Sequence, residues 1–431
     1  MLAEAQSVQD ATGRFGGYRW RICGLLFWAT TLNYIDRQVL GVLAPALGHA
    51  LGWTQLDYGY IVAAFQVAYA IGLVAAGALI DKLGTRLGYA LAIGLWSVAA
   101  MSHSLARTVL AFAAARFMLG LGEAGNFPAA VKTVAEWFPR RERAFATGLF
   151  NAGSNVGALI APFVVPIAVS LWGLRSGFLL TGVLSAAWLL TWLIVYRPPG
   201  QHRRLRAQEL AYIVADGDAA SARRPLRWRA LLRHRQTWAF VAGKFLTDPV
   251  WWFLLFWLPK YLHHRYGLDL TSLALPLISI YAMADAGSIG GGWLAGRLMR
   301  AGWSLNAARK GAMLLCALAV VPVVWTSAVH ELWAAVGLIG LAAAAHQGWS
   351  ANLFTTVSDL YPSVEVASVV GLGGFAGAIS GALVSTAVGL LLQATGSYAL
   401  LFSIAGGLYL VALGVIQLLA PRWSPVPLAA A

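Results

Sequence analysis

Apolar runs of about 20 residues recur throughout this chain of 431 residues, and short polar segments separate them. As a helix, one such run is long enough to cross a hydrocarbon core of about 30 Å. The chain is 59% hydrophobic and only 11% charged, whereas a soluble domain carries about 25% charged residues. The strands of a membrane β-barrel would alternate polar and apolar residues, which these runs do not. The sequence therefore predicts an all-α polytopic membrane protein.

We expect twelve transmembrane helices, because the apolar runs lie at 20–47, 58–80, 87–106, 109–136, 144–169, 175–196, 237–262, 273–296, 308–328, 331–357, 366–393 and 398–420. The longest polar stretch, 197–236, separates a six-helix bundle over 20–196 from a second one over 237–421. Residues 1–19 and 422–431 are expected to be tails. The first run is too long for the apolar core of a cleaved signal peptide, so it should remain as a helix.

Basic residues concentrate in alternate connections between the runs. The basic set contains Lys82, Arg86, Arg140, Arg141, Arg143, ten arginines of 197–236, Arg297, Arg300, Arg309 and Lys310. Because cytoplasmic loops are rich in lysine and arginine, these connections, the linker and both tails should face the cytoplasm. We expect a multi-pass membrane protein. Topology accounts for the net charge of +14, so no nucleic-acid partner is expected.

The two halves look like repeats of one another. Three pairs share an offset of 223 residues: Pro139 with Pro362, Glu142 with Glu365 and Gly148 with Gly371. Gly77-Ala-Leu-Ile-Asp-Lys and Gly292-Trp-Leu-Ala-Gly-Arg also follow corresponding spans. Two pseudo-symmetric halves are typical of a transporter that rocks about a site near the midplane.

Charged residues inside the first and fourth spans indicate where that site lies. Asp36 and Arg37 are in span one, and Arg116 and Glu123 are in span four. Each costs roughly 2.5–3.5 kcal/mol at the bilayer centre, so they should face protein or water. Adjacent residues point in different directions on a helix. We expect Arg37 to face the cavity and bind a substrate carboxylate through its planar fork, and Asp36 to turn toward span four. The alternative is buried ion pairs that only fix packing.

Further polar and aromatic side chains could contact a substrate. The candidates are Tyr34 in span one, Tyr69 in span two, Arg116 in span four, Asn155 with Asn151 and Ser154 in span five, Lys244 and Trp251 in span seven, and Gln347, Trp349 and Asn352 in span ten. Packing explains several of them equally well: Lys244 could simply balance Asp248, and tryptophans are common in interfacial belts. Pro249 is expected to kink span seven. Asp285 in span eight has no obvious partner.

The segment Gly77-Ala-Leu-Ile-Asp81-Lys-Leu-Gly-Thr-Arg86 resembles the loop signature of the major facilitator superfamily. Gly77 would allow close contact between helices. Asp81 is placed to meet a helix N-terminus or nearby arginines, and thereby to latch one conformation. Gly296 replaces the acid in the second copy, so we expect an asymmetric latch. The resemblance implies the major facilitator fold.

Three further motifs resemble the anion:cation symporter family, namely Leu32-Asn-Tyr-Ile-Asp-Arg-Gln-Val-Leu40, Gly120-Leu-Gly-Glu-Ala-Gly-Asn-Phe-Pro-Ala129 and Glu136-Trp-Phe-Pro-Arg-Arg-Glu-Arg-Ala144. Asp248-Pro-Val-Trp-Trp-Phe-Leu-Leu-Phe-Trp-Leu-Pro259 and His346-Gln-Gly-Trp-Ser-Ala-Asn352 resemble its hexuronate transporters. The resemblance implies proton-coupled uptake of an organic anion such as galacturonate or glucuronate. It also implicates the acids at Asp36 and Glu123 in proton coupling, the arginines at Arg37 and Arg116 in the same network, and Tyr69 in substrate contact.

The expected function is therefore proton-coupled import of a sugar-acid monoanion by alternating access, with Glu123 as the main proton carrier. The partners are the anion, protons and the lipid bilayer; a functional monomer driven by the proton gradient needs no cofactor. An aldonate such as galactonate is the alternative substrate, and a receptor that binds without translocating is the alternative of another class. No nucleophile and base, phosphate-binding loop or metal-ligand spacing stands out, so neither an enzyme nor a metal site is expected.

Overall fold

The computed structural model describes residues 17–215, 228–268 and 272–426. Most of the two predicted tails (1–16 and 427–431) and the linker arginines Arg223, Arg224 and Arg227 lie outside these ranges. Within them, every regular element is helical. The long helices are α2 (Tyr18–Leu51), α3 (Gln55–Leu83), α4 (Thr85–Ser102), α5 (Val109–Glu123), α6 (Asn126–Trp137), α7 (Arg140–Trp172), α8 (Ser176–Val195), α11 (Arg235–Tyr266), α12 (Ala274–Arg300), α13 (Leu305–Val320), α14 (Leu332–Leu360), α15 (Val366–Thr395) and α16 (Ala399–Leu419).

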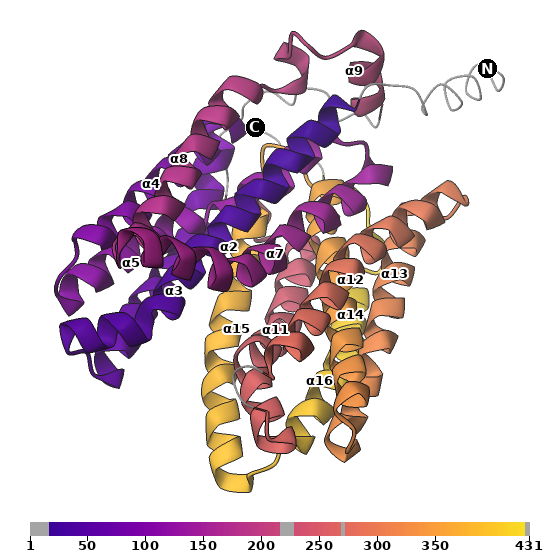
Figure 1. Cartoon of the computed structure of the whole chain (residues 1–431). Coiled ribbons are helices and arrows are strands. Elements are labelled where there is room, and N and C mark those ends of the chain that lie inside the picture. Colours follow the sequence, from indigo (N-terminus) through magenta and orange to yellow (C-terminus); the bar gives the residue numbers. More distant parts are fainter. Residues whose placement is uncertain (1–16, 216–227, 269–271, 427–431) are drawn as a thin grey trace, which may run out of the picture.

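The helices form two bundles, one from α2 to α8 and one from α11 to α16 (Figure 1). Each of the twelve predicted spans coincides with a helix, but two spans are interrupted. The fourth is divided into α5 and α6 directly after Glu123. The ninth continues from α13 as the 3-10 helix η3 (Val321–Ala328), which has a proline in its first turn, where a missing backbone N–H is tolerated.

Six described helical segments are long and apolar enough to cross a membrane by themselves: Leu56–Leu83, Arg140–Trp172, Ser176–Val195, Leu305–Ala328, Val366–Val384 and Ala399–Leu419. A seventh is α11, which bends by 45° between Arg235–Leu254 and Trp257–Tyr266. The bend lies one turn before Pro259 and not at Pro249, where we predicted it. Pro259 cannot donate to the carbonyl four residues earlier and its ring crowds that carbonyl, so it accounts for the position of the bend.

Glycines let the halves cross at van der Waals distance. A Cβ on Gly77 would overlap the backbone of Ala367, and one on Gly371 would overlap Leu73, so α3 and α15 touch through their main chains. In the same way Gly148 lies against Ser288, and Gly292 lies against Ala144, where α7 meets α12. These are the glycines that the repeat singled out. The two pseudo-equivalent contacts between the halves therefore follow from the internal symmetry of the sequence.

The first part of the linker is docked on the N-terminal half. Its short helix α9 (Ala207–Ile213) supplies Glu209, which is 3.2 Å from Arg19 on α2. Arg19 also pairs with Glu142 at 2.7 Å, and the hydroxyl of Tyr212 donates to Glu142 at 2.6 Å. Burial, with the hydrogen bond to Glu142, raises the pKa of Tyr212 to about 12. These contacts lie where α2 and α7 begin, which we call the basic end of the molecule.

Candidate functional site

A cavity lies between the two halves, with about 690 Å³ of space free of protein atoms, part of it open to solvent. Both halves contribute charged, amide and aromatic side chains to its wall. The lining residues are Tyr34, Arg37, Tyr69, Leu73, Phe127, Asn151, Ser154, Lys244, Asp248, Trp251, Trp252, His346, Gln347, Ser350, Phe354, Val370, Gly374 and Ala378. Of the predicted substrate contacts, the cavity brings together Arg37, Tyr34, Tyr69, Lys244, Trp251 and Gln347.

Arg37 is the charged group that the N-terminal half presents to the cavity. Its Nη2 lies 3.0 Å from Oε2 of Glu123, and its Nε donates to the same oxygen at 3.0 Å. The guanidinium carbon lies over three rings, at 4.7 Å from the centre of Tyr34, 4.6 Å from Tyr69 and 5.1 Å from Phe65. Aromatic faces attract a cation without neutralising it. Arg37 is therefore fixed in orientation by the rings, and Glu123 is the group that an anion would have to displace.

Glu123 is completely buried at the end of α5. Its Oε2 accepts the hydrogen bond from Arg37, whereas its Oε1 has no hydrogen-bond partner among the described residues. A buried carboxylate oxygen without a partner is costly as an anion, and a bound proton removes that cost. The arrangement is therefore suited to a group that exchanges a proton with the cavity.

Arg116 supports this pair from behind. Its Nη2 donates to the main-chain carbonyl of Arg37 at 3.1 Å, and its guanidinium lies 5.6 Å from the ring centre of Phe65. It is buried and is not part of the cavity wall. The prediction that Arg116 contacts substrate therefore has no support in this geometry, which instead gives it a positioning role.

We predicted that Asp36 turns toward span four, near Arg116 or Glu123, but its hydrogen-bond partner is on a different helix. Its Oδ2 accepts a hydrogen bond of 2.7 Å from the Ser185 hydroxyl on α8, the sixth span. Its other oxygen has no hydrogen-bond partner in the described part of the chain. Successive residues of a helix are about 100° apart, so when Arg37 faces the cavity and α5, Asp36 faces the neighbouring α8.

Three other predicted contacts lie outside the cavity wall. Asn155 donates to Oδ1 of Asp285 at 2.7 Å. Asn155 is therefore the partner of Asp285, for which the sequence suggested none. Asn352 donates to the carbonyls of Gly291 and Gly348, each at 2.9 Å. Trp349 is fully buried. These residues join helices to one another, because the rotation of α7 and α14 turns them away from the cavity.

Asn151 and Ser154 take the place that we expected for Asn155. Asn151 donates to Oε1 of Gln347 at 2.7 Å and to the Ser288 hydroxyl at 3.1 Å, so it joins α7 to two helices of the other half. The sequence signal was present, since Asn151, Ser154 and Asn155 lie within about one turn of helix. Phe127, Ser350 and Phe354 also line the cavity, and nothing in their sequence context distinguished them from core residues.

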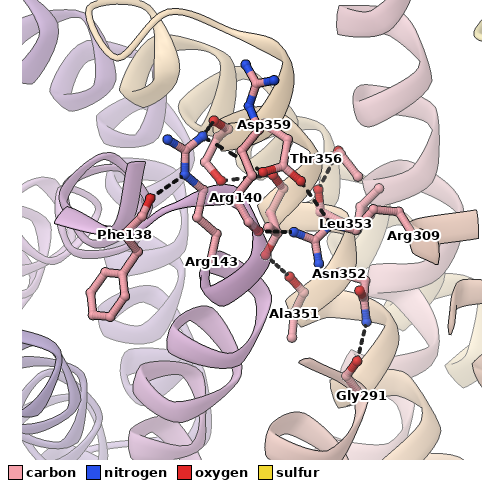
Figure 2. A network of polar contacts seen from close by, with 12 residues as sticks. Phe138, Arg140, Arg143, Gly291, Arg309, Ala351, Asn352, Leu353, Thr356 and Asp359 are labelled. Carbon is pink, nitrogen blue, oxygen red and sulfur yellow. Dashed lines mark hydrogen bonds and ion pairs between the residues drawn. The ribbon is translucent and has the colours of Figure 1, made fainter. Parts of the chain in front are cut away.

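An ion pair between Arg143 and Asp359 and hydrogen bonds to main-chain carbonyls join the two halves at the basic end (Figure 2). Arg309 pairs with Asp359 inside the C-terminal half. Asp359 on α14 lies 2.9 Å from Nε of Arg309 and 3.8 Å from Nη1 of Arg143 on α7. Arg309 Nη2 also donates to the carbonyl of Arg140 at 2.9 Å, and Arg143 donates to the carbonyl of Ser358. All three side chains of this group, Arg143, Arg309 and Asp359, are buried. We call them the Asp359 latch.

The acid of the loop motif forms a second latch. Asp81 accepts hydrogen bonds from Ser368 N at 2.7 Å and Ala367 N at 3.3 Å, at the N-terminus of α15. Lys132 pairs with the same carboxylate at 2.6 Å. The predicted contact between Asp81 and a helix N-terminus is confirmed. The basic partner of Asp81 is Lys132, where we expected arginines. Arg86 is placed on its own half, where it donates to the carbonyl of Leu193 at 2.6 Å.

Replacing Asp359 with asparagine should open the basic end. The change leaves Arg143 and Arg309 without their buried counter-charge, and loss of one partner of a buried pair costs about 3–5 kcal/mol. Spin labels at the exposed positions Lys82 and Arg300, one on each half, should report a longer distance in Asp359→Asn than in the wild type. Arg175→Gln, which removes an exposed charge elsewhere, should leave the distance unchanged. Equal distances in all three proteins would show that the latch does not hold this state.

No group of three or more His, Cys, Asp or Glu side chains in the described ranges could hold a metal ion.

Comparison with known proteins places the chain among transporters. The family described as Major Facilitator Superfamily matches residues 26–385. A hexuronate transporter of Escherichia coli K12 is 33% identical over 384 residues, which cover 88% of this chain and 89% of that protein. A galacturonate transporter of Dickeya chrysanthemi is 36% identical over 64% of this chain and 81% of its own length. A D-galactonate transporter of Escherichia coli is 30% identical over 88% and 91%. The crystal structure of an Escherichia coli fucose:proton symporter shares the fold, with a TM-score of 0.70, 18% identity and coverage of 95% of this chain and 100% of that one.

Proposed function

Because the chain belongs to the Major Facilitator Superfamily, we propose that it imports a sugar-acid monoanion, a hexuronate, together with protons by alternating access. Relatives named for hexuronate and galacturonate transport support the substrate class. The observation that carries the proposal is the cavity between the halves, where Arg37 faces the space while held by the buried acid Glu123. A substrate carboxylate and Glu123 compete for one guanidinium, so binding of the anion is linked to protonation of the acid.

The transport cycle starts with the cavity facing outward. Protons neutralise Asp36 and Glu123, and Arg37 is released to bind the substrate carboxylate with both of its terminal nitrogens. The loaded halves then rock about the glycine crossings, which requires the Asp81 contact and the Asp359 latch to break. The higher pH inside removes the protons, Glu123 recaptures Arg37, and the anion leaves. The proton gradient is the energy source, and no cofactor takes part.

The orientation follows from the basic end. Arginines and lysines gather at this end, as they do in cytoplasmic loops, so we place it and both tails in the cytoplasm of a bacterial cell whose inner membrane holds the protein. The state described here is then closed toward the cytoplasm. One chain contains the whole cavity, which supports a functional monomer.

Galactonate is the second candidate substrate, since one relative carries its name and it too presents one carboxylate and several hydroxyls. A competition assay on the purified full-length protein separates the candidates. Galacturonate and glucuronate should displace a labelled hexuronate best, galactonate less well, and galactose at least about a hundredfold more weakly, because a neutral sugar loses charge-assisted hydrogen bonds worth about 3 kcal/mol. Competition by galactose at the concentrations effective for galacturonate would overturn the proposal.

Counterflow into liposomes distinguishes a carrier from a receptor, because a receptor binds substrate without exchanging it across the membrane.

A further inference from the structure

A second charged pair faces the cavity from the C-terminal half and takes no part in the cycle above. Nζ of Lys244 lies 2.7 Å from Oδ2 of Asp248, one turn later on α11. Their side chains are 8% and 17% exposed, and both residues line the cavity. A charge pair inside the helix bundle of a membrane protein is expensive and marks a functional position by default. The question is which part of a substrate it would contact.

The pair is held rigidly, but its hydrogen-bonding capacity is not used up. The carboxylate of Asp248 lies directly against Gly377 on α15, where a Cβ would overlap it. The Lys244 ammonium lies 4.4 Å from the ring centre of Phe354. An ammonium has three donors and a carboxylate about four acceptor positions, of which their mutual contact uses one each. Such a pair can donate to one hydroxyl oxygen and accept from two hydroxyl protons at the same time.

An aromatic surface continues the same wall one turn further along α11. Trp251 stacks on His346 with ring centres 5.0 Å apart and an angle of 6° between the planes. His346 is held in turn by the hydroxyl of Tyr409. The indole also lines the cavity, so it presents a fixed flat apolar surface there. The C–H face of a six-membered sugar ring fits such a surface, whereas an open-chain polyol has no comparable flat face.

We propose that Lys244, Asp248 and Trp251, the α11 wall, bind the ring and hydroxyls of a cyclic sugar acid whose carboxylate is bound by Arg37. The inference rests on the proposed function and goes further, because it assigns the two ends of the substrate to opposite halves. It commits the site to the pyranose form of a hexuronate. The rival occupant is a sugar dicarboxylate, whose second carboxylate would bind Lys244 alone.

Binding to the full-length protein in nanodiscs tests the proposal with four probes: galacturonate, open-chain galactonate, the dicarboxylate galactarate, and cyclohexanecarboxylate, which has the ring and the charge but no hydroxyls. The wild type should prefer galacturonate to cyclohexanecarboxylate by at least about a hundredfold, because unpaired polar groups reject an analogue without hydroxyls. The paired variant Lys244→Gln with Asp248→Asn keeps size and net charge, and should reduce that preference at least about tenfold. Trp251→Leu should lower the preference for galacturonate over galactonate, and Trp251→Phe should largely retain it.

The outcomes separate this inference from the proposed function. If the wild type binds galacturonate and both sets of variants keep their preferences, the α11 wall does not read the ring, although sugar-acid transport stands. If galactarate binds more tightly than galacturonate and loses that advantage in Lys244→Gln, Lys244 is a second anion site and the inference is overturned. If the wild type binds none of the probes, the proposed function itself fails.

Discussion

Arg37→Gln is expected to weaken hexuronate binding by about a hundredfold to ten-thousandfold. A bidentate carboxylate contact provides two charge-assisted hydrogen bonds of about 1.5–3 kcal/mol each, and each 1.4 kcal/mol is about tenfold in affinity. Arg37 is the group that presents this fork to the cavity from the N-terminal half, and it is aligned by Glu123 and three aromatic rings. Calorimetric titration of the purified variant with galacturonate measures the effect.

Two further variants separate loss of the ligand from loss of charge balance. Arg37→Lys keeps the charge but not the fork, so its affinity should lie between those of the wild type and Arg37→Gln. Arg37→Gln combined with Glu123→Gln leaves no unpaired buried acid and should bind as poorly as Arg37→Gln alone. Recovery of binding in the double variant would show that Arg37 only neutralises Glu123. Binding by Arg37→Gln within about threefold of the wild type would exclude Arg37 as the anion ligand.

Glu123→Gln is expected to abolish uphill accumulation while leaving exchange of substrate intact. The amide can still accept a hydrogen bond from Arg37, but it cannot bind and release a proton. With a gradient of one pH unit and one coupled proton, the wild type can accumulate substrate about tenfold, since one unit is worth about 1.4 kcal/mol. The variant should reach only equal concentrations, and the pH dependence of its exchange rate should be strongly reduced, with Asp36 as the remaining acid. Uptake of labelled galacturonate into proteoliposomes measures both quantities.

Asp285→Asn is the matched control for that experiment. Asp285 is a half-buried acid near the middle of α12, and it accepts a hydrogen bond from Asn155 without lining the cavity. Its replacement removes a carboxyl from the membrane interior, yet accumulation should persist. Loss of accumulation in Asp285→Asn but not in Glu123→Gln would move the proton site to the other half.

Much of the fold could be predicted because it depends on the lengths and periodicity of apolar runs. The runs located twelve helical spans, and the repeated glycines at Gly77, Gly148, Gly292 and Gly371 located the crossings between the halves. The break after Glu123 could not be predicted, because the segment from Val109 to Trp137 is a mostly apolar run that is long enough to form one continuous helix. At that break Gly122 and Gly125 pack closely against Ala92 and Trp96 of α4. Packing of this kind is not encoded in local periodicity.

The site was predictable where residue chemistry alone restricted the choice. A charged residue in a membrane must face the interior, which favoured Arg37 and Lys244 as cavity residues. The same rule did not distinguish Arg37 from Arg116, which is not part of the cavity wall. Polar residues without charge were not restricted in this way. A step of one residue turns a side chain by about 100°, so Asn151 reaches the cavity and Asn155 does not. The direction of Asp36 depended on which helix lies beside α2, and the position of α8 comes from tertiary packing.

Proton movement driven by substrate is the direct measure of coupling between the proton and the anion. The full-length protein is reconstituted into liposomes containing a trapped pH-sensitive dye, with no initial gradient, and galacturonate is added outside. We expect the interior to acidify with the wild type as galacturonate enters, and galactose to have no effect. In liposomes preloaded with unlabelled galacturonate, Glu123→Gln should exchange it for labelled galacturonate without acidification. Entry of galacturonate through the wild type with no change in internal pH would show that proton and anion do not share the Arg37–Glu123 pair.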